Sequence, residues 1–190
     1  ETDIYHLIDE QRDALLEMAD FIHDNPEYDG EEVQASALLT DYLKKNGFEV
    51  QLGLGSWSTA FRAVWHHGQG GPRIGLLCEY DALPGMGHAC AHHLQGPSIC
   101  GAAVALKNAG IGENFSIVVY GTPAEETRSA KVSLQSEGFF SDIDVALMMH
   151  GGPDTCVDIK SMALTNYTVV FKGISAHAAL APEKGRSALD

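Results

Sequence analysis

The stretch 73–80, RIGLLCEY, is a short and almost continuous apolar run. Two runs of the same kind follow it: 115–120, FSIVVY, and 144–149, DVALMM. Continuous apolar strands are typical of a parallel or mixed sheet that helices cover, because such strands are buried on both faces. The three runs therefore predict three buried strands of one sheet.

Helix-like stretches separate the three runs. Residues 96–108 lie between the first and second runs, and residues 130–137 lie between the second and third. The order is β-α-β-α-β, which is typical of layered α/β domains. We therefore predict an α/β domain with a mixed, largely parallel sheet and helices on both faces.

The residues before this core predict two helices and two further strands. Apolar residues recur at helical spacing over 4–22, so we expect an amphipathic helix that ends before Pro26. A second helix is expected over 31–46. The runs 48–52 and 59–67 are strand-like.

The pattern changes after His150. Residues 162–172 are rich in β-forming types, and a helix is expected to begin near Arg186. A domain seldom ends one turn into a helix, so we expect a truncated chain. The predicted division gives a first domain over 1–160 and the start of a second over 161–190.

Composition narrows the classes of partner. The chain has 190 residues and a formal net charge of -14, which disfavours phosphate backbones and anionic lipid as partners. It contains no apolar run of about 18 residues and no visible signal peptide, so we expect a cytoplasmic protein. The chain begins at Glu1 rather than Met, which leaves a preceding segment open.

The predicted strand ends carry residue types that bind metals. In open α/β sheets, ligands bind beyond the carboxyl ends of the strands. The first run is followed by HACAHH at 88–93, the second by the pair Glu125 and Glu126, and the third by His150. We therefore expect a functional site at this edge of the sheet.

The HACAHH segment places one thiol and three imidazoles close together in the chain: Cys90, with His88, His92 and His93. Thiolate and imidazole ligands suit zinc and related transition metals. A group of partly exposed histidines beside a buried cysteine is the simpler alternative, but the carboxylates at neighbouring strand ends favour a metal site. Cys90 as a nucleophile stays open, although catalytic thiols usually lie at a helix N-terminus with one base.

The remaining candidates are carboxylates and histidines. Of the pair Glu125 and Glu126, one side chain can bind a metal while the other reaches a water molecule, although a solvated acidic pair opening a helix is the alternative. His150 is a candidate ligand or a core histidine. His177 is a candidate donor to an oxyanion or a surface histidine.

Together these motifs resemble the M20 metallopeptidases. The similarity is to the amidohydrolase branch, which includes aminobenzoyl-glutamate, indole-acetyl-amino-acid and N-acyl-amino-acid hydrolases. It covers essentially the whole chain. The motifs that carry it are HDNPE at 23–27, CEYDALPGMGHACAHH at 78–93, GTPAEE at 121–126 and GISAHAALAPEKGRSALD at 173–190.

The resemblance implies a two-metal hydrolase that cleaves the amide bond of a small N-acyl amino acid or dipeptide-like substrate. Its cofactors would be two divalent ions, zinc or manganese. Cys90 would bridge them, and the further ligands would be His92, Glu126 and His150. Neither nucleic acid nor membrane is implied as a partner.

The resemblance also implies catalytic roles and a domain arrangement. Glu125 would be the general base, and Asp81 would orient a metal ligand. His177 would stabilise the oxyanion across a homodimer interface. Residues 1–160 would be the N-terminal part of a metal-dependent catalytic domain, and 161–190 the start of a lid that mediates dimerisation.

Several positions depart from the family pattern. Ala91 stands where the family usually has Gly, and His93 where it usually has Asp or Asn. Thr127 and Arg128 replace small, Gly-rich residues. The family's last metal ligand is expected beyond residue 190, so the chain alone is not expected to be active.

These departures leave two alternative functions. One is a catalytically degenerate protein of the same fold that binds a metal or another ligand. The other is a thiol-dependent hydrolase that uses Cys90. The identity of the substrate and the choice between zinc and manganese stay open, because specificity in this family depends largely on the lid and later loops.

Overall fold

The computed structural model describes residues 4–157, 162–165 and 167–189. The chain forms two compact units, Glu1–Pro153 and Asp154–Asp190, and each is described by itself. The division into domains at residue 160 stays a prediction.

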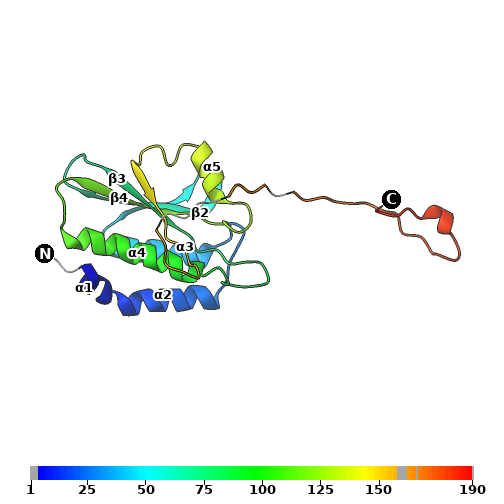
Figure 1. Ribbon diagram of the computed structural model, residues 1–190, viewed down its shortest axis with the longest axis horizontal. Helices are drawn as coiled ribbons and strands as arrows, with labels where there is room; N and C mark the ends of the chain where they lie inside the picture. Colours follow the sequence, from blue (N-terminus) through cyan, green and yellow to red (C-terminus); the bar gives the residue numbers. More distant parts are fainter. Residues whose placement is uncertain (1–3, 158–161, 166, 190) are drawn as a thin grey trace. The chain divides into compact units, whose positions relative to one another are not determined.

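The first unit is built on a five-stranded sheet in the order β1-β2-β4-β3-β5 (Figure 1). β1 pairs with β2, and β2 with β4, in antiparallel register; β3 is parallel to both β4 and β5. The predicted mixed sheet is therefore confirmed, but the sheet is not largely parallel as predicted, because two of its four strand pairings are antiparallel. The strands are β1 Glu49–Leu54, β2 Trp57–His67, β3 Arg73–Cys78, β4 Phe115–Gly121 and β5 Val145–Leu147.

Helices cover both faces of this sheet. Figure 1 shows α2, α3 and α4 on one face and α5 on the other. The described part of the chain contains no helix with the length and apolar character needed to cross a bilayer. The helices of the first unit are α1 Ile4–Asp9, α2 Arg12–Asp24, α3 Val33–Lys45, α4 His92–Ala109 and α5 Ala130–Ser136.

Two apolar cores hold these layers together. The larger lies between the sheet and the helices α2, α3 and α4, and it includes Leu39, Phe61 and Ile117, which have no exposed surface. The smaller packs Ala130 and Leu134 of α5 against the opposite face. Both faces of the central strand β4 are therefore covered, which explains its continuous apolar sequence.

The first predicted helix is interrupted. The apolar periodicity over 4–22 predicted one helix, but α1 and α2 are separate. At the break, the side-chain amide of Gln11 donates to the carbonyl of Leu7 at 2.6 Å. A side chain therefore satisfies a carbonyl that a continuous helix would pair with a backbone N–H.

The third apolar run is not buried as predicted. β5 covers only three residues, and its Val145 and Leu147 are 48% and 53% exposed. β5 pairs with β3 alone and is the last strand on its side of the described sheet. Its apolar side chains therefore face solvent in this unit.

Glu27, in the early HDNPE segment, fixes the start of α3. Its carboxylate accepts the backbone N–H groups of Gln34 and Ala35, which have no partner within the helix. Its carbonyl accepts the N–H of Ala82 at 2.7 Å. One residue thus joins the beginning of α3 to the chain that follows β3.

The second unit contains little regular structure in its described residues. Residues 162–165 and 167–172 form no strand, so the predicted β-rich run is not found there. A short 3-10 helix, Pro182–Lys184, and a bridge between Ile174 and Arg186 are present. Residues 186–189 are not helical, so the predicted helix does not begin near Arg186 in the described chain.

Asp142 contacts side chains of three strands of the sheet. Its contribution to stability can be tested by varying the pH. It pairs with Arg62 and Arg73 and accepts a hydrogen bond from Tyr120. Burial raises the pKa of Asp142, but the Tyr120 hydrogen bond and the two guanidinium groups outweigh burial and hold the pKa below its ordinary value of 3.8. A lowered pKa in the folded state adds stability above the unfolded value, and that stability is lost as the pH falls through the folded value.

We therefore expect Asp142→Asn to have a lower urea midpoint than the unmodified chain near neutral pH. The difference should shrink toward zero as the pH falls below 3.8, because both proteins then carry a neutral side chain at this position. Asp41→Asn is the matched control, since Asp41 forms an exposed pair with Lys44. A midpoint difference that is the same at every pH would contradict this account.

Candidate metal centre

The chain between β3 and α4 turns into the helix at Ala91. This residue has a φ of 65°, a left-handed conformation that favours Gly. The Ala91 carbonyl accepts the N–H groups of Leu94 and Gln95, the first hydrogen bonds of α4. His92 consequently lies in the first turn of the helix, four residues before the predicted start at 96.

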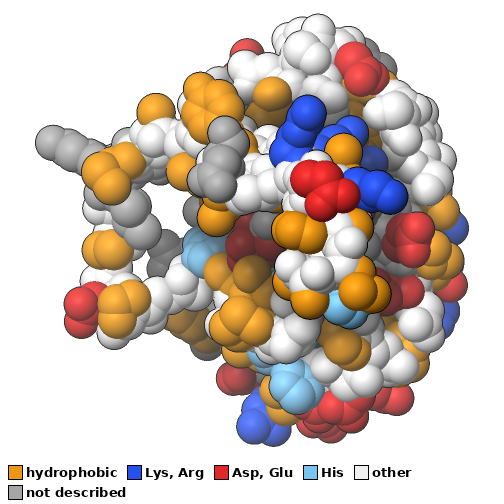
Figure 2. Space-filling view, turned by 90° about the vertical axis from the view of Figure 1, so that its right-hand side faces the viewer, with side chains coloured by type: hydrophobic (Ala, Val, Ile, Leu, Met, Phe, Trp, Pro, Cys, Tyr) orange, Lys and Arg blue, Asp and Glu red, His pale blue; other side chains and the backbone are white. Residues whose placement is uncertain are grey.

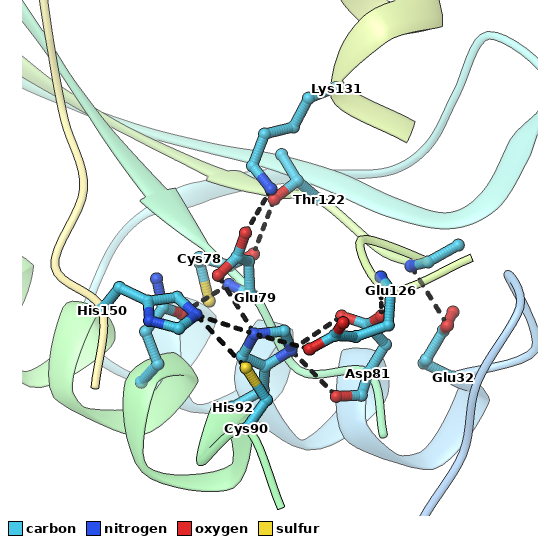
Figure 3. A network of polar contacts seen from close by, with 12 residues as sticks. Glu32, Cys78, Glu79, Asp81, Cys90, His92, Thr122, Glu126, Lys131 and His150 are labelled. Atoms are coloured by element: carbon cyan, nitrogen blue, oxygen red, sulfur yellow. Dashed lines mark hydrogen bonds and ion pairs between the residues drawn. The ribbon is translucent and has the colours of Figure 1, made fainter. Parts of the chain in front are cut away.

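Three candidate ligands from two parts of the chain converge (Figure 3). The imidazole nitrogen Nε2 of His150, which follows β5, lies 3.5 Å from Cys90 Sγ and 3.4 Å from His92 Nε2. One ligand atom from each residue fits within a span of 4.8 Å. The sequence predicted all three as ligands, and the structure brings them together.

A second group shares His92. One ligand atom each from Glu79, His92 and Glu125 also lies within 4.8 Å of the others. Glu79 is 1% exposed, its Oε2 is 3.4 Å from His92 Nε2, and its other oxygen contacts Lys131. The sequence patterns did not single out Glu79 as a ligand, although its place directly after β3 was a usable signal.

Glu126 lies at the edge of these groups. Its Oε1 is 3.9 Å from His92 Nε2, so it is near the centre without belonging to either group. Its backbone N–H donates to Asp81 Oδ2 at 3.0 Å. The position of Glu126 is therefore fixed through Asp81.

Asp81 also orients His92. The Nδ1 of His92 lies 3.0 Å from both the carbonyl and the Oδ1 of Asp81, which leaves Nε2 directed at the other ligands. A carboxylate behind a ligating histidine fixes the tautomer and the ring orientation. Burial lowers the pKa of His92, but the Asp81 hydrogen bond and the charge of Glu79 outweigh burial and raise the pKa.

The loop that carries Glu125 and Glu126 follows β4 and is supported by Glu32. Ala124 has a φ of 55°, and its N–H donates to Glu32 Oε1 at 3.2 Å. Glu32 is fully buried and also accepts hydrogen bonds from Gly30 and Thr59. The sequence patterns did not assign Glu32 a role, although it lies shortly after the HDNPE segment at 23–27 that contributes to the family resemblance.

Arg128, one of the departures from the family pattern, anchors the same loop from the outside. Its Nε donates to Asp29 Oδ1 at 2.8 Å, and its guanidinium carbon lies 4.7 Å from the centre of the Trp57 ring. Charge pairing and stacking on an aromatic face are both characteristic of arginine. Arg128, which stands where the family has small residues, therefore has structural partners in this chain.

The Cys90 thiol and Glu125, the candidate base, lie in different charge environments. Burial, then the hydrogen bond to Glu126 and the neighbouring carboxylates, raise the pKa of Cys90 to about 12. Reactive thiols instead have neighbours that lower their pKa, so this setting does not favour a nucleophilic cysteine. Burial and the charge of Glu79 raise the pKa of Glu125, which suits a group that accepts and returns a proton.

The residues present fit divalent cations. Glu79 Oε2 and Glu126 Oε1 are buried and have no hydrogen-bond partner among the described atoms. An unpaired buried carboxylate oxygen is costly, and a cation would satisfy it. Figure 2 shows Asp and Glu side chains at several places on the face that it draws.

Two histidines of the predicted metal-binding segment 88–93 are not members of the two ligand groups. His88 and His93 belong to neither set of converging ligands. Burial, with the nearby histidines, lowers the pKa of His88 to about 4. His177 lies in the second unit, where its Nδ1 accepts the N–H groups of Ala179 and Leu180 at 3.2 Å, and its role at the oxyanion stays a prediction.

Known proteins are similar to this chain in sequence and fold. Over 99% of its length the chain is 36% identical to a p-aminobenzoyl-glutamate hydrolase polypeptide of Escherichia coli (strain K12), of which it spans 44%. It is also 36% identical to the Xaa-Arg dipeptidase of Homo sapiens, over 96% of this chain and 46% of that protein. The crystal structure of the Bacillus subtilis YXEP protein, a dinuclear metal binding peptidase from the M20 family, matches 74% of this chain and 43% of its own, with a TM-score of 0.66 and 25% identity.

This chain belongs to the M20 family. The predicted resemblance is therefore confirmed, although no family model matches the sequence. The aminobenzoyl-glutamate utilization protein from Klebsiella pneumoniae shares the M20 fold over 99% of this chain, with a TM-score of 0.63 and 18% identity. The chain spans less than half the length of the Escherichia coli and human M20 relatives.

Proposed function

We propose that the whole protein is a two-metal hydrolase that cleaves the amide bond of a small N-acyl amino acid or dipeptide-like substrate. The observation that carries this proposal is the convergence of two ligand groups on His92, at the carboxyl ends of parallel strands. The names of the relatives support the class of substrate, since they describe p-aminobenzoyl-glutamate and Xaa-Arg dipeptides.

The proposed ligands of two zinc or manganese ions are Cys90, which would bridge them, with His92, Glu126 and His150. Glu79 is a further candidate because its buried oxygen faces His92. When bound, two such ions lower the pKa of an attacking water molecule and polarise the substrate carbonyl. The mixture of thiol, imidazole and carboxylate donors suits zinc and tolerates manganese.

Glu125 is the proposed general base rather than a ligand, although its carboxylate belongs to the second converging group. It would take a proton from the attacking water and later give that proton to the leaving amine. Asp81 would hold His92 in the tautomer that presents Nε2. We further propose that residues 161–190 begin a lid through which the protein forms a homodimer, and that His177 donates a hydrogen bond to the developing oxyanion.

Metal content tests this proposal. Protein purified without chelator should contain about two zinc or manganese ions more per chain than the double variant Cys90→Ala, His92→Ala, because that variant removes members of both ligand groups. Elemental analysis measures the difference. The double variant Cys156→Ala, His6→Ala is the control, since it changes the same residue types at exposed positions.

Equal metal content in the unmodified protein and the Cys90→Ala, His92→Ala variant, even after excess metal is added, would refute the two-metal centre. Bound metal that depends on Cys90 and His92, together with no hydrolysis of any N-acyl amino acid or dipeptide by the whole protein, would favour the degenerate binding protein instead.

A further inference from the structure

Three histidines outside the ligand groups form a cluster of their own. The ring of His93 is close to two others: its centroid is 5.0 Å from that of His23 and 5.3 Å from that of His88. His23 is near the end of α2, His88 is in the chain before α4, and His93 is in the first turn of α4. The cluster therefore joins segments that are far apart in the sequence.

The inner part of this cluster has unsatisfied nitrogen atoms. His88 is only 8% exposed, and neither of its ring nitrogens has a hydrogen-bond partner among the described atoms. The Nδ1 of His93 is buried and unpaired as well. Buried polar atoms in native proteins are nearly always paired, so three unpaired imidazole nitrogens at one place indicate a missing partner.

The separation of the His93 ring from each of the other two is that of two imidazoles on one metal ion. With zinc–nitrogen bonds of about 2 Å and a tetrahedral angle, two coordinated rings have their centroids about 5 Å apart. Both measured separations match this value. The ring normals also differ by 61° and 57°, so the rings are not stacked on one another.

His23 has a partner of the kind found behind metal ligands. Its Nδ1 lies 3.1 Å from Asp24 Oδ1, which leaves Nε2 for coordination. These three residues are not among the groups whose ligand atoms all lie within 4.8 Å of one another. Their nitrogen atoms therefore do not converge on one point in this conformation. The side chain of His23 is 60% exposed and has room to turn toward the other two rings.

We propose that His23, His88 and His93 bind a transition-metal ion, with Zn²⁺ as the ion to be tested, at a site distinct from the hydrolytic centre. Three imidazoles without hard oxygen ligands suit zinc, copper or nickel and disfavour magnesium or calcium. Successive residues on a helix do not face each other, so His92 and His93 serve different sites. The bound ion would tie the end of α2 to the first turn of α4, next to Cys90 and His92.

The test uses the Cys90→Ala, His92→Ala variant, which lacks the shared ligand of the hydrolytic centre. Titration with ZnCl₂, followed by calorimetry, should still show one ion per chain. Adding His23→Gln or His93→Asn should weaken that binding about 100-fold or more, and Asp24→Asn about 10- to 100-fold. His66→Gln, which changes an exposed histidine on β2, should leave it unchanged.

Side-chain ¹⁵N spectra give a second readout: zinc should shift the ring nitrogens of His23, His88 and His93 but not those of His66. Because His23 is exposed, His23→Gln tests the site without disturbing the core. No zinc bound by the double variant, or zinc binding that neither His23→Gln nor His93→Asn weakens, would overturn the proposal. Neither result bears on the metal that depends on Cys90 and His92. The histidine site can therefore be refuted while the proposed two-metal centre stands.

Discussion

Glu125→Gln in the whole protein is expected to lower kcat about 10²- to 10⁴-fold while KM changes little. The amide has nearly the same shape as the carboxylate but cannot take a proton from water. Burial first, and then the charge of Glu79, raise the pKa of Glu125, which suits the role of general base proposed for it. Steady-state kinetics on an N-acyl amino acid or dipeptide substrate measure the effect.

Glu126→Gln is the matched variant, since it makes the same change one residue along the chain. Glu126 is a proposed ligand, so this variant is expected to lose metal, whereas Glu125→Gln is expected to keep the metal content of the unmodified protein. Elemental analysis of both variants separates the roles. Turnover that survives in Glu125→Gln with its metal in place would show that the assigned base is wrong.

Glu32→Ala is expected to lower the free energy of unfolding by about 3 kcal/mol. The substitution removes the acceptor for two backbone N–H groups, those of Gly30 and Ala124, and for the hydroxyl of Thr59. Glu32 is fully buried, so water does not readily replace it as a partner. Equilibrium unfolding in urea, followed by circular dichroism, measures the loss.

The neighbouring residue provides the control for this prediction. Glu31 is exposed, so Glu31→Ala should change the free energy of unfolding little. Glu32→Gln should fall between the two, because it retains one carbonyl oxygen as an acceptor. A loss in Glu32→Ala no larger than that in Glu31→Ala would mean that the buried carboxylate does not support the turn at Ala124.

The central strands could be predicted because burial leaves a direct mark on their sequence. β3 and β4 are covered by neighbouring strands and helices, and both were predicted to within two residues. The antiparallel pairing of β2 with β4 could not be predicted, because it depends on contacts between residues 50 or so positions apart, such as Trp65 and Ile117. The exposure of β5 could not be predicted either, since an apolar run does not indicate which of its sides is covered.

The candidate site was predictable in its residue types but not in its grouping. The segment 88–93 was interpreted as one cluster, whereas the structure places Cys90 and His92 with His150, and His88 and His93 with His23. Neighbouring positions on a helix diverge, and a short motif does not show where the helix begins. The role of Glu32 could not be predicted for a different reason: its partner Ala124 is 92 positions away.

The two oxygens of Asp81 have different partners: one lies beside the His92 ring and the other accepts the N–H of Glu126. A single buried carboxylate therefore positions both the His92 ring and the backbone of Glu126 at the candidate metal centre. A cation that bound there would meet a His92 ring already held in one orientation, so little side-chain entropy of His92 would be lost.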